Sequence, residues 1–171
     1  MKKYITIIVL AILSFGLNAQ SENLDDKHKE YPIVKALIGD KWTGSGVLMG
    51  KEATFTMDWQ RVLGNKFLKL EFQNERKSED DKNIVFNATA FYKIVNDSTV
   101  VGNWFDIRGM TFPLKGSLTE NELTIFWGNE ETEMGKTIYY FSNNNVITVE
   151  DFVMNKGEYF KFGSAQYNIK D

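Results

Sequence analysis

Cysteine is absent from this 171-residue chain, and histidine occurs once, as His28. Without cysteine the protein forms no disulfide, carries no lipid on an N-terminal cysteine and has no thiol nucleophile. His28 lies in a polar stretch ahead of the domain, and no serine stands in a G-x-S-x-G turn. The sequence therefore excludes a histidine-based catalytic triad within the domain.

Positive charge is also scarce. The chain has 20 Lys and Arg against 23 Asp and Glu, and no basic face is evident. A protein that binds duplex nucleic acid normally carries such a face, so nucleic acid is not expected as a partner. Adjacent acids occur at 79–81 and 130–131, without the alternation or the glycine of a calcium loop. We interpret them as solvated charges on loops and predict no metal site.

A long apolar run occupies residues 4–15, after the basic pair Lys2 and Lys3, and small or polar residues follow it as far as Ala19. This layout is typical of a secretory signal peptide, and the run is shorter than the ~20 residues of a membrane span. An uncleaved anchor is the alternative. We predict a signal peptide at 1–19, a polar leader at 20–30 and one domain at 31–171. The mature protein is then exported to the periplasm or the medium of a bacterium, without stable membrane insertion.

Residues 31–38 predict the only helix, because Pro32 suits a first helical turn and Gly39 suits its end. Beyond it, turn-forming residues separate ten runs that are rich in aromatic and β-branched residues. One of these turns is Gly64-Asn65, a dipeptide typical of a two-residue hairpin. Regular spacing of this kind indicates an antiparallel barrel or sandwich.

The alternation of side chains favours the barrel. Phe55, Met57 and Trp59 form a clean apolar face, whereas the run at 100–108 mixes large apolar groups with two charges on one face. The interior of a ligand-sized barrel tolerates such a face, and the dry core of a sandwich does not. We therefore predict an all-β fold, a ten-stranded antiparallel up-and-down barrel like those of lipocalins and fatty-acid-binding proteins, with one short N-terminal helix.

Several short motifs occur in the order and spacing of a known family. They are 37–44 (LIGDKWTG), Trp59, 62–64 (VLG), 66–68 (KFL), Trp104 with Asp106 and Gly109, and 157–158 (GE). Over residues 33–169 the chain resembles the DUF1579 family, lipocalin-like bacterial domains of unknown function. The first motif is similar to the first strand of calycin-type barrels, in which a glycine shortly precedes a tryptophan, with a spacing one residue wider than in lipocalins. The resemblance implies a lipocalin-like barrel and no particular activity.

Related ten-stranded barrels include haem-binding, nitrobindin-like proteins, which use a histidine as the axial ligand. No position of the predicted barrel is a histidine, and ligation by Tyr or Met would depart from that pattern. We therefore predict no haem and no other cofactor.

The candidate ligand-binding residues are those expected to place polar groups among aromatic ones inside the barrel. They are Phe55, Met57, Trp59, Arg61, Trp104, Asp106, Arg108 and Glu150. Two further faces of mixed polarity are Phe67 with Lys69 and Glu71, and Thr148 with Glu150 and Phe152. Aromatic walls with a few converging polar groups are typical of a small-molecule pocket. We expect Trp59, Arg61, Trp104 and Asp106 to line one such cavity.

These patterns predict an exported binding protein for a small, largely apolar molecule. A structural alternative remains for the charged residues, because Arg61 and Asp106 can simply pair with each other or cap the barrel mouth. Trp42 is expected to pack at the closed end beside the helix. Two other classes of function remain open. One is an enzyme that uses Asp106 or Glu150 as a general acid or base, and the other is a structural or interaction protein with a filled barrel.

Overall fold

The computed structural model of the protein describes residues 31–142 and 146–169. The predicted signal peptide, the polar leader and the turn at 143–145 lie outside the described residues. The elements are α1 (Pro32–Leu37), β1 (Lys41–Leu48), β2 (Lys51–Val62), β3 (Phe67–Lys77), β4 (Asn83–Ile94), β5 (Thr99–Asp106), β6 (Thr111–Leu118), β7 (Glu122–Trp127), β8 (Gly135–Ser142), β9 (Val146–Asn155) and β10 (Glu158–Ile169).

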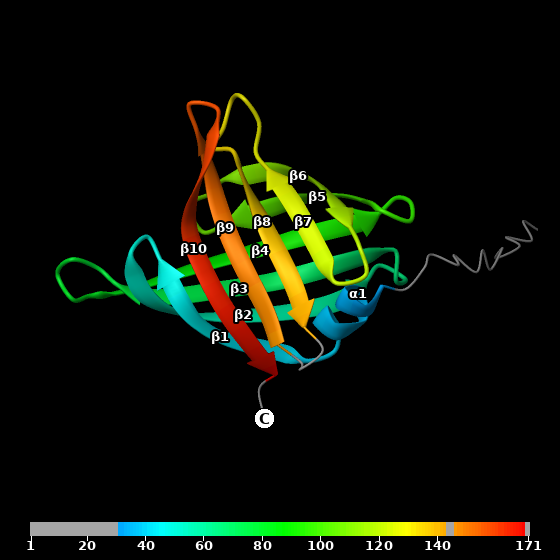
Figure 1. Ribbon diagram of the computed structural model, residues 1–171, viewed down its shortest axis with the longest axis horizontal. Helices are drawn as coiled ribbons and strands as arrows, with labels where there is room; N and C mark the ends of the chain where they lie inside the picture. The colour runs from blue at the N-terminus through cyan, green and yellow to red at the C-terminus, as the bar shows by residue number, and fades with distance from the viewer. Residues whose placement is uncertain (1–30, 143–145, 170–171) are drawn as a thin grey trace, which may run out of the picture.

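The ten strands form one closed barrel in which each strand pairs with its neighbours in the sequence (Figure 1). All of the pairs are antiparallel, and β10 closes the ring by pairing with β1 from Trp42↔Ile169 to Leu48↔Gly163. Closure leaves no unpaired strand edge, which is the main hazard of an isolated sheet. The predicted all-β, up-and-down barrel with one short helix is confirmed.

The hairpin at Gly64-Asn65 joins β2 to β3, but its loop is longer than the predicted two residues. The last pair of the two strands is Val62↔Phe67, so residues 63–66 form the connection. Three successive residues, Leu63, Gly64 and Asn65, have positive φ angles of 53°, 66° and 65°. Glycine and asparagine tolerate this left-handed conformation, whereas leucine does so at a steric cost. The dipeptide therefore predicts the position of the turn correctly but not the length of the loop.

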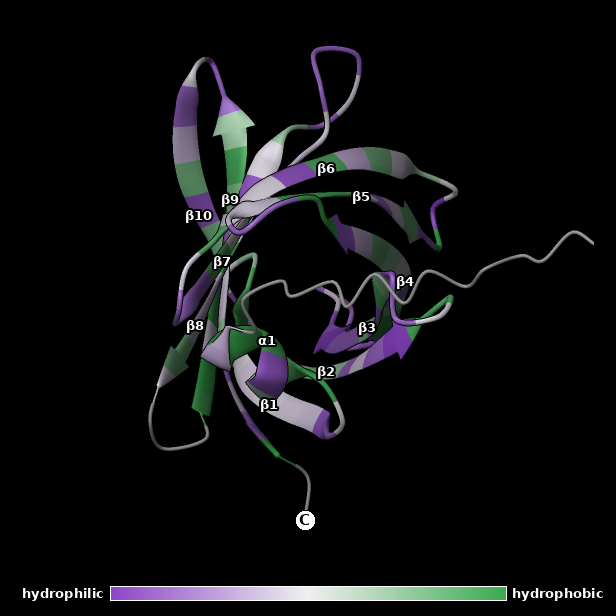
Figure 2. Ribbon diagram, turned by 90° about the vertical axis from the view of Figure 1, so that its right-hand side faces the viewer, coloured by the Kyte–Doolittle hydropathy of each residue, from purple (hydrophilic) through white to green (hydrophobic). Residues whose placement is uncertain are grey.

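Hydropathy alternates along several strands, as the banded colouring of Figure 2 shows, in keeping with side chains that point alternately into and out of the barrel. The predicted inward face of β2 is confirmed, since Phe55, Met57 and Trp59 are all buried. Two other expected faces are wrong. On β3 the inward residues are Leu68 and Leu70, so Phe67, Lys69 and Glu71 lie on the opposite face.

On β9 the buried residues are Ile147 and Val149, so Thr148, Glu150 and Phe152 lie on the outer face. There Glu150 forms an ion pair with Lys161 of the neighbouring strand β10. The physical reason for the error is that both faces of β9 mix apolar and polar side chains. A shift of one residue then exchanges the two faces completely.

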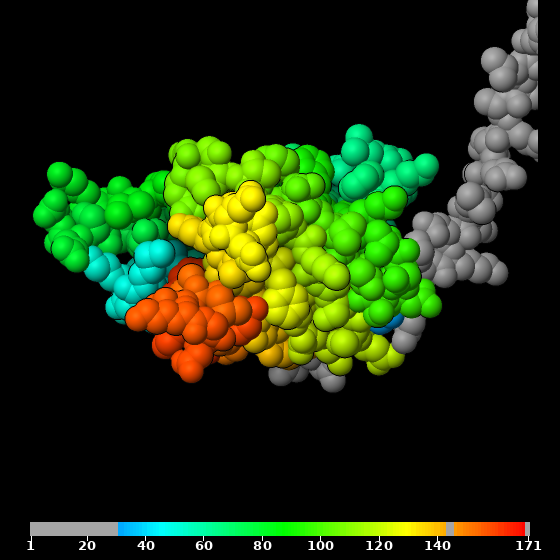
Figure 3. All heavy atoms as spheres, turned by 90° about the horizontal axis from the view of Figure 1, so that it is seen from above, coloured from blue at the N-terminus to red at the C-terminus, as the bar shows by residue number. Residues whose placement is uncertain are grey.

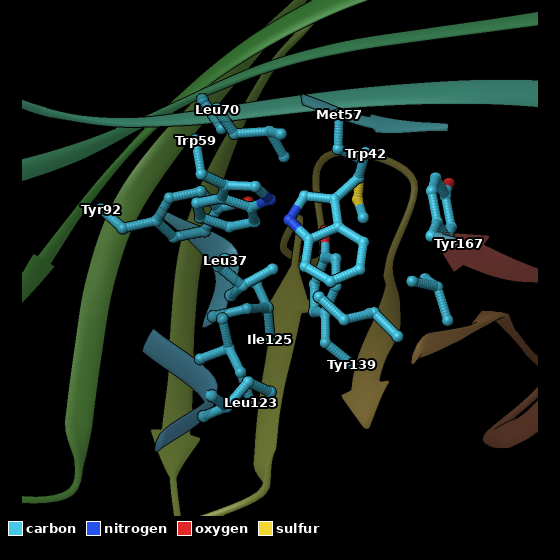
Figure 4. Packing of buried hydrophobic residues seen from close by; sticks show 14 of the residues in the cluster. Leu37, Trp42, Met57, Trp59, Leu70, Tyr92, Leu123, Ile125, Tyr139 and Tyr167 are labelled. Carbon is cyan, nitrogen blue, oxygen red and sulfur yellow. The ribbon is translucent and has the colours of Figure 1, made fainter. Parts of the chain in front are cut away.

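One end of the barrel is sealed by α1 together with a layer of large side chains. Ile33, Val34 and Leu37 of the helix are buried, and the Ile33 N–H donates to the Glu120 carbonyl at 3.0 Å. Figure 4 shows Leu37 beside the indoles of Trp42 and Trp59 in this layer. Trp42 has 1% of its surface exposed and belongs to the core cluster, in agreement with its predicted packing role. Of the helices in the described part of the chain, none has the length and hydropathy needed to cross a membrane.

Candidate functional site

Between the sealed layer and the other end of the barrel lies a cavity of about 380 Å³. Its floor is made by side chains that also belong to the core, namely Phe55, Tyr92, Leu114, Ile125 and Tyr139. Each comes from a different strand, so the floor spans the barrel from β2 to β8. The volume lies within the ~300–1,000 Å³ typical of ligand pockets.

Aromatic rings form much of the cavity wall. Trp104 stacks on Phe86 with ring centroids 6.5 Å apart and packs at 5.8 Å from Phe72. Phe112 of the neighbouring strand β6 pairs with Trp104, and its ring lies 5.8 Å from that of Trp127. Gly135 makes room for Trp127, because a Cβ at that position would overlap the indole ring. The result is a wall of flat apolar surfaces, the type of lining that buries a hydrophobic ligand.

Asp151 supplies a carboxyl group partway along the cavity. It is the first inward residue of β9 beyond Ile147 and Val149, which are sealed in the core. Thr137, its partner on β8, donates a hydrogen bond of 2.7 Å from Oγ1 to Asp151 Oδ1. Among the described residues no Lys or Arg forms an ion pair with this carboxyl. Burial raises the pKa of Asp151 to about 6, and the Thr137 hydrogen bond offsets only part of that effect.

Three tyrosines surround this carboxyl from other strands. Tyr92 comes from β4, Tyr139 from β8 and Tyr167 from β10. Burial raises the pKa of Tyr92, Tyr139 and Tyr167, and the negative charge of Asp151 raises each further. All three phenols are therefore neutral at physiological pH, and those of Tyr92 and Tyr139, which line the cavity, can act as hydrogen-bond donors or acceptors toward a ligand.

The open end of the cavity carries a charged cluster centred on Arg108. Its guanidinium lies 2.8 Å from Asp106 Oδ2 and 3.2 Å from Glu133 Oε2, and it covers the rings of Phe86 and Phe112 at 5.7 and 5.9 Å. Burial pushes the pKa of Asp106 upward, but hydrogen bonds from the Arg108 side chain and backbone outweigh it, so the pKa is lowered. The hydrogen bond to Asp106 is the main reason that the pKa of Arg108 is raised. Asp106 is thus an ionised partner of Arg108 and not a proton donor.

A second arginine, Arg76 of β3, borders the same opening. Its Nη1 donates to Asn74 Oδ1 at 3.3 Å, and its Nη2 lies 3.9 Å from the Met49 sulfur. Asn74 is one of the few buried polar residues and also lines the cavity. Seen from above in Figure 3, the turn after β1 (cyan), the loop after β7 (yellow) and the hairpin of β9 and β10 (orange) gather on one side of the molecule. Hydrogen bonds from Met49 N to Phe162 O and from Met154 N to Met134 O join these segments.

The predicted site residues fall into separate places. Phe55, Trp104 and Arg108 line the cavity. Asp106 lies beneath Arg108 and accepts a hydrogen bond of 3.4 Å from Trp104 Nε1, so the predicted neighbourhood of Trp104, Asp106 and Arg108 exists. The alternative pairing of Asp106 with Arg61 is wrong, because Arg108 is the partner of Asp106.

The other four predicted residues lie away from the cavity. Met57 and Trp59 have no exposed surface and belong to the sealed layer. Arg61 is exposed near the end of β2 that follows Trp59, and Glu150 is on the outer face of β9. The expectation that Trp59, Arg61, Trp104 and Asp106 line one cavity is therefore wrong. Alternation of side chains gives the inward face of a strand but not the depth of a residue along the barrel axis.

Sequence reasoning missed Asp151, Thr137, Tyr139, Asn74 and Arg76. A signal existed for Asp151. Ile147 and Val149 are the most apolar alternate pair of β9, and the next residue on the same face of the strand is Asp151. Thr137 follows from its pairing with Asp151, which only the barrel register reveals. The same kind of signal exists on β3, where Asn74 and Arg76 lie on the same face of the strand as the apolar residues Leu68 and Leu70.

The described residues contain no group of three or more His, Cys, Asp or Glu side chains arranged to hold a metal ion. The predicted absence of haem and of other cofactors stays a prediction. Its basis is the composition of the chain, whose sole histidine precedes the described residues.

Comparison with protein-family models gives no match, and comparison with curated proteins gives none either. Among solved structures, the chain is similar to the one described as "Crystal Structure of Rv2717c from M. tuberculosis", with a TM-score of 0.59 and 12% sequence identity. The alignment covers 81% of this chain and 96% of that chain. At this identity the likeness shows the fold alone: the chain shares its architecture with Rv2717c.

Proposed function

We propose that this protein is an exported β-barrel that binds a small, largely apolar molecule in the cavity above its sealed core. The observation that carries the proposal is the aromatic cavity of about 380 Å³, with the half-buried carboxyl of Asp151 in its wall and charged side chains at its opening. Concave apolar pockets with a few converging polar groups are the usual form of small-molecule sites.

The cavity also favours a binding function over the alternative of a structural protein with a filled barrel. In a filled barrel the inward residues meet across the axis, as Trp59 and Tyr139 do in the sealed layer with ring centroids 5.7 Å apart. Further along the same strands, Phe55 and Thr137 border the cavity instead. Apolar space of this size that no side chain fills is costly for stability, so the presence of the cavity supports a role in binding.

A titration with the neutral fluorescent probe N-phenylnaphthylamine tests the proposal. Val153 lines the cavity, and Val153→Trp adds an indole to that space. Val85 is 43% exposed on the outer face of β4, so Val85→Trp makes the same change without touching the cavity. We expect saturable fluorescence enhancement with the wild type and with Val85→Trp, and at least a tenfold weaker response with Val153→Trp. A folded wild type that leaves the probe unbound would remove the basis of the proposal.

Export belongs to the same proposal and rests on the signal-peptide pattern at residues 1–19. N-terminal sequencing of the protein recovered from the periplasm or the medium tests it. We expect a mature chain that starts at or near Gln20. A chain that keeps Met1 and fractionates with membranes would contradict export of a soluble barrel.

A second candidate function is acid–base catalysis on a bound molecule, and Asp151 is the observation that favours it. A carboxyl with a pKa of about 6 in an apolar cavity is suited to proton transfer near neutral pH. The residues expected from the sequence suit this role less, because Asp106 is held ionised by Arg108 and Glu150 lies on the outside. Turnover of a bound compound that is lost in Asp151→Asn, with binding retained, would identify an enzyme.

A further inference from the structure

We infer that the ligand carries a basic, hydrogen-bond-donating nitrogen that lies against Asp151, so that the ligand class is a small hydrophobic amine. This inference rests on the proposed binding function and assigns the polar end of the ligand within the same cavity. It follows from the position of the carboxyl, from the lack of a cationic partner for it, and from the aromatic surroundings.

Asp151 has unmet hydrogen-bonding capacity. An ionised carboxylate accepts about four hydrogen bonds through its two oxygens. Oδ1 accepts one from Thr137, while the Oδ2 atom lies beside Gly163, whose missing side chain keeps the space next to it open. Among the described residues no cation forms an ion pair with either oxygen. A half-buried carboxylate without a cationic partner is unfavourable, and an ammonium group from a ligand would provide both the charge and the donors.

The cavity wall around Asp151 is largely aromatic. Tyr92, Tyr139, Phe55, Phe72 and Trp104 line the same cavity. Aromatic faces attract cations through their quadrupoles, and more strongly where water is excluded. A carboxylate set among aromatic rings therefore favours an organic ammonium over a neutral or anionic head group.

The charged residues at the opening do not reverse this preference. Arg108 already pairs with two carboxylates, Asp106 and Glu133, so little of its charge remains for an anionic ligand. Among the residues that line the cavity, Arg76, which hydrogen bonds to Asn74, is the cation to which a carboxylate head could bind. A ligand held there would lie at the opening of the cavity and would not depend on Asp151, which makes the two modes distinguishable.

Binding of an amine at Asp151 should depend on pH. The groups that face Asp151 are Thr137 and Tyr139 on β8, Tyr167 on β10 and Tyr92 on β4, with Arg76, Arg108 and Glu133 at the opening. The pKa of each tyrosine is raised, so none of the three phenols ionises between about pH 5 and about pH 8. With a pKa of about 6, Asp151 loses its negative charge as the pH falls through this range. An amine should then bind about tenfold more weakly at about pH 5 than at about pH 7.5, because a proton competes with it for the carboxylate.

The experiment compares three probes with one ring system and different head groups: naphthylmethylamine, naphthylmethanol and naphthoate. Calorimetric titrations are made at about pH 7.5 and about pH 5, the range that spans the change in Asp151 charge. The variants are Asp151→Asn and, as the matched control, Glu150→Gln. The control makes the same chemical change at the adjacent residue of β9, on the outer face of the barrel.

We expect the amine to bind most tightly at the higher pH, to weaken about tenfold at the lower pH, and to lose its advantage over the alcohol in Asp151→Asn but not in Glu150→Gln. Binding of all three probes without a preference for the amine, or tightest binding of naphthoate, would overturn the inference and leave the binding function intact. If the folded wild type binds none of the probes, the proposed function fails with it. The pH profile of the wild type decides the question by itself if Asp151→Asn does not fold.

Discussion

Thr137 Oγ1 donates a hydrogen bond of 2.7 Å to Asp151 Oδ1 across the pairing of β8 with β9. This is the only hydrogen bond that a described residue makes to the Asp151 carboxyl, and it lies where the sealed core gives way to the cavity. Ionisation of Asp151 in the cavity therefore affects the stability of the barrel, because burial of the carboxyl is unfavourable once it ionises.

Replacing Asp151 by Asn should remove a pH dependence of stability. The pKa of Asp151 is raised from 3.8 to about 6 in the folded protein, so its favourable contribution is complete below about pH 4 and is lost as the pH rises through 6. Above that pH the wild type bears a cost of at most about 3 kcal/mol for the buried charge. We expect Asp151→Asn to be the more stable protein at neutral pH, with a flatter profile between about pH 4 and about pH 7.

Thermal unfolding across that pH range measures the difference. Glu150→Gln is the control, since Glu150 pairs with Lys161 on the outer face. Its profile should follow that of the wild type. Identical profiles for Asp151→Asn and the wild type would mean that the carboxyl is better solvated than its position indicates.

Replacing Thr137 by Val should shift the titration of Asp151. Valine has nearly the same shape but cannot donate, so the ionised carboxyl loses its hydrogen bond and its pKa rises further. We expect a loss of about 1–3 kcal/mol at neutral pH, the usual cost of leaving a buried acceptor without its donor. Two-dimensional NMR of the Asp151 carboxyl carbon gives the pKa directly. Thr137→Ser keeps the hydroxyl and should titrate as the wild type does.

Truncating Trp59 and Trp104 to Ala should separate the sealed layer from the cavity wall. Trp59 has no exposed surface and stacks on Tyr92 with ring centroids 5.1 Å apart, so Trp59→Ala should cost about 3–5 kcal/mol. Trp104 borders existing space, so Trp104→Ala should cost clearly less while it weakens binding of an apolar probe. Chemical denaturation and probe titration of both variants test this. Equal, core-sized losses of stability would favour a filled barrel.

Replacing Leu68 by Pro should destabilise the barrel. Leu68 pairs with Arg61 of β2 and with Tyr92 of β4, so β3 is bordered on both sides and has no free edge. Proline in a central strand removes a ladder hydrogen bond and costs about 3 kcal/mol or more. Leu68→Ala removes the same buried side chain without changing the backbone and serves as the control. If the two variants unfold at the same temperature, the Leu68 N–H is not part of the ladder.

The fold could be predicted because its signals are local. Each turn carries residues that adopt positive φ or cap a strand end, such as Gly50, Gly109 and Gly157, and the intervening runs alternate in polarity. Closure of the barrel follows from the number and antiparallel order of the strands. The loop at 63–66 shows the limit of such signals, since Gly64-Asn65 does not encode whether its neighbours join the turn or the strands.

The site could be predicted only in part because it depends on relations between strands. Glu150 and Asp151 are adjacent acids on a strand with two mixed faces, and the pairing with β8 and β10 decides which one points inward. The position of a residue along the barrel axis cannot be predicted from the sequence either. Trp59 and Trp104 both lie on inward faces, yet one is sealed beside α1 and the other borders the cavity. Neither distinction is contained in a period of two residues.

The central claim is that the closed barrel holds a small apolar molecule in its cavity, and native mass spectrometry tests it most directly. The protein is purified without detergent from the organism that makes it, and a second sample is saturated with N-phenylnaphthylamine before the measurement. We expect the wild type and Val85→Trp to retain a small molecule that is released on denaturation, and Val153→Trp to show the mass of the bare chain. A folded wild type that carries neither a molecule from its source nor the added probe would contradict the claim.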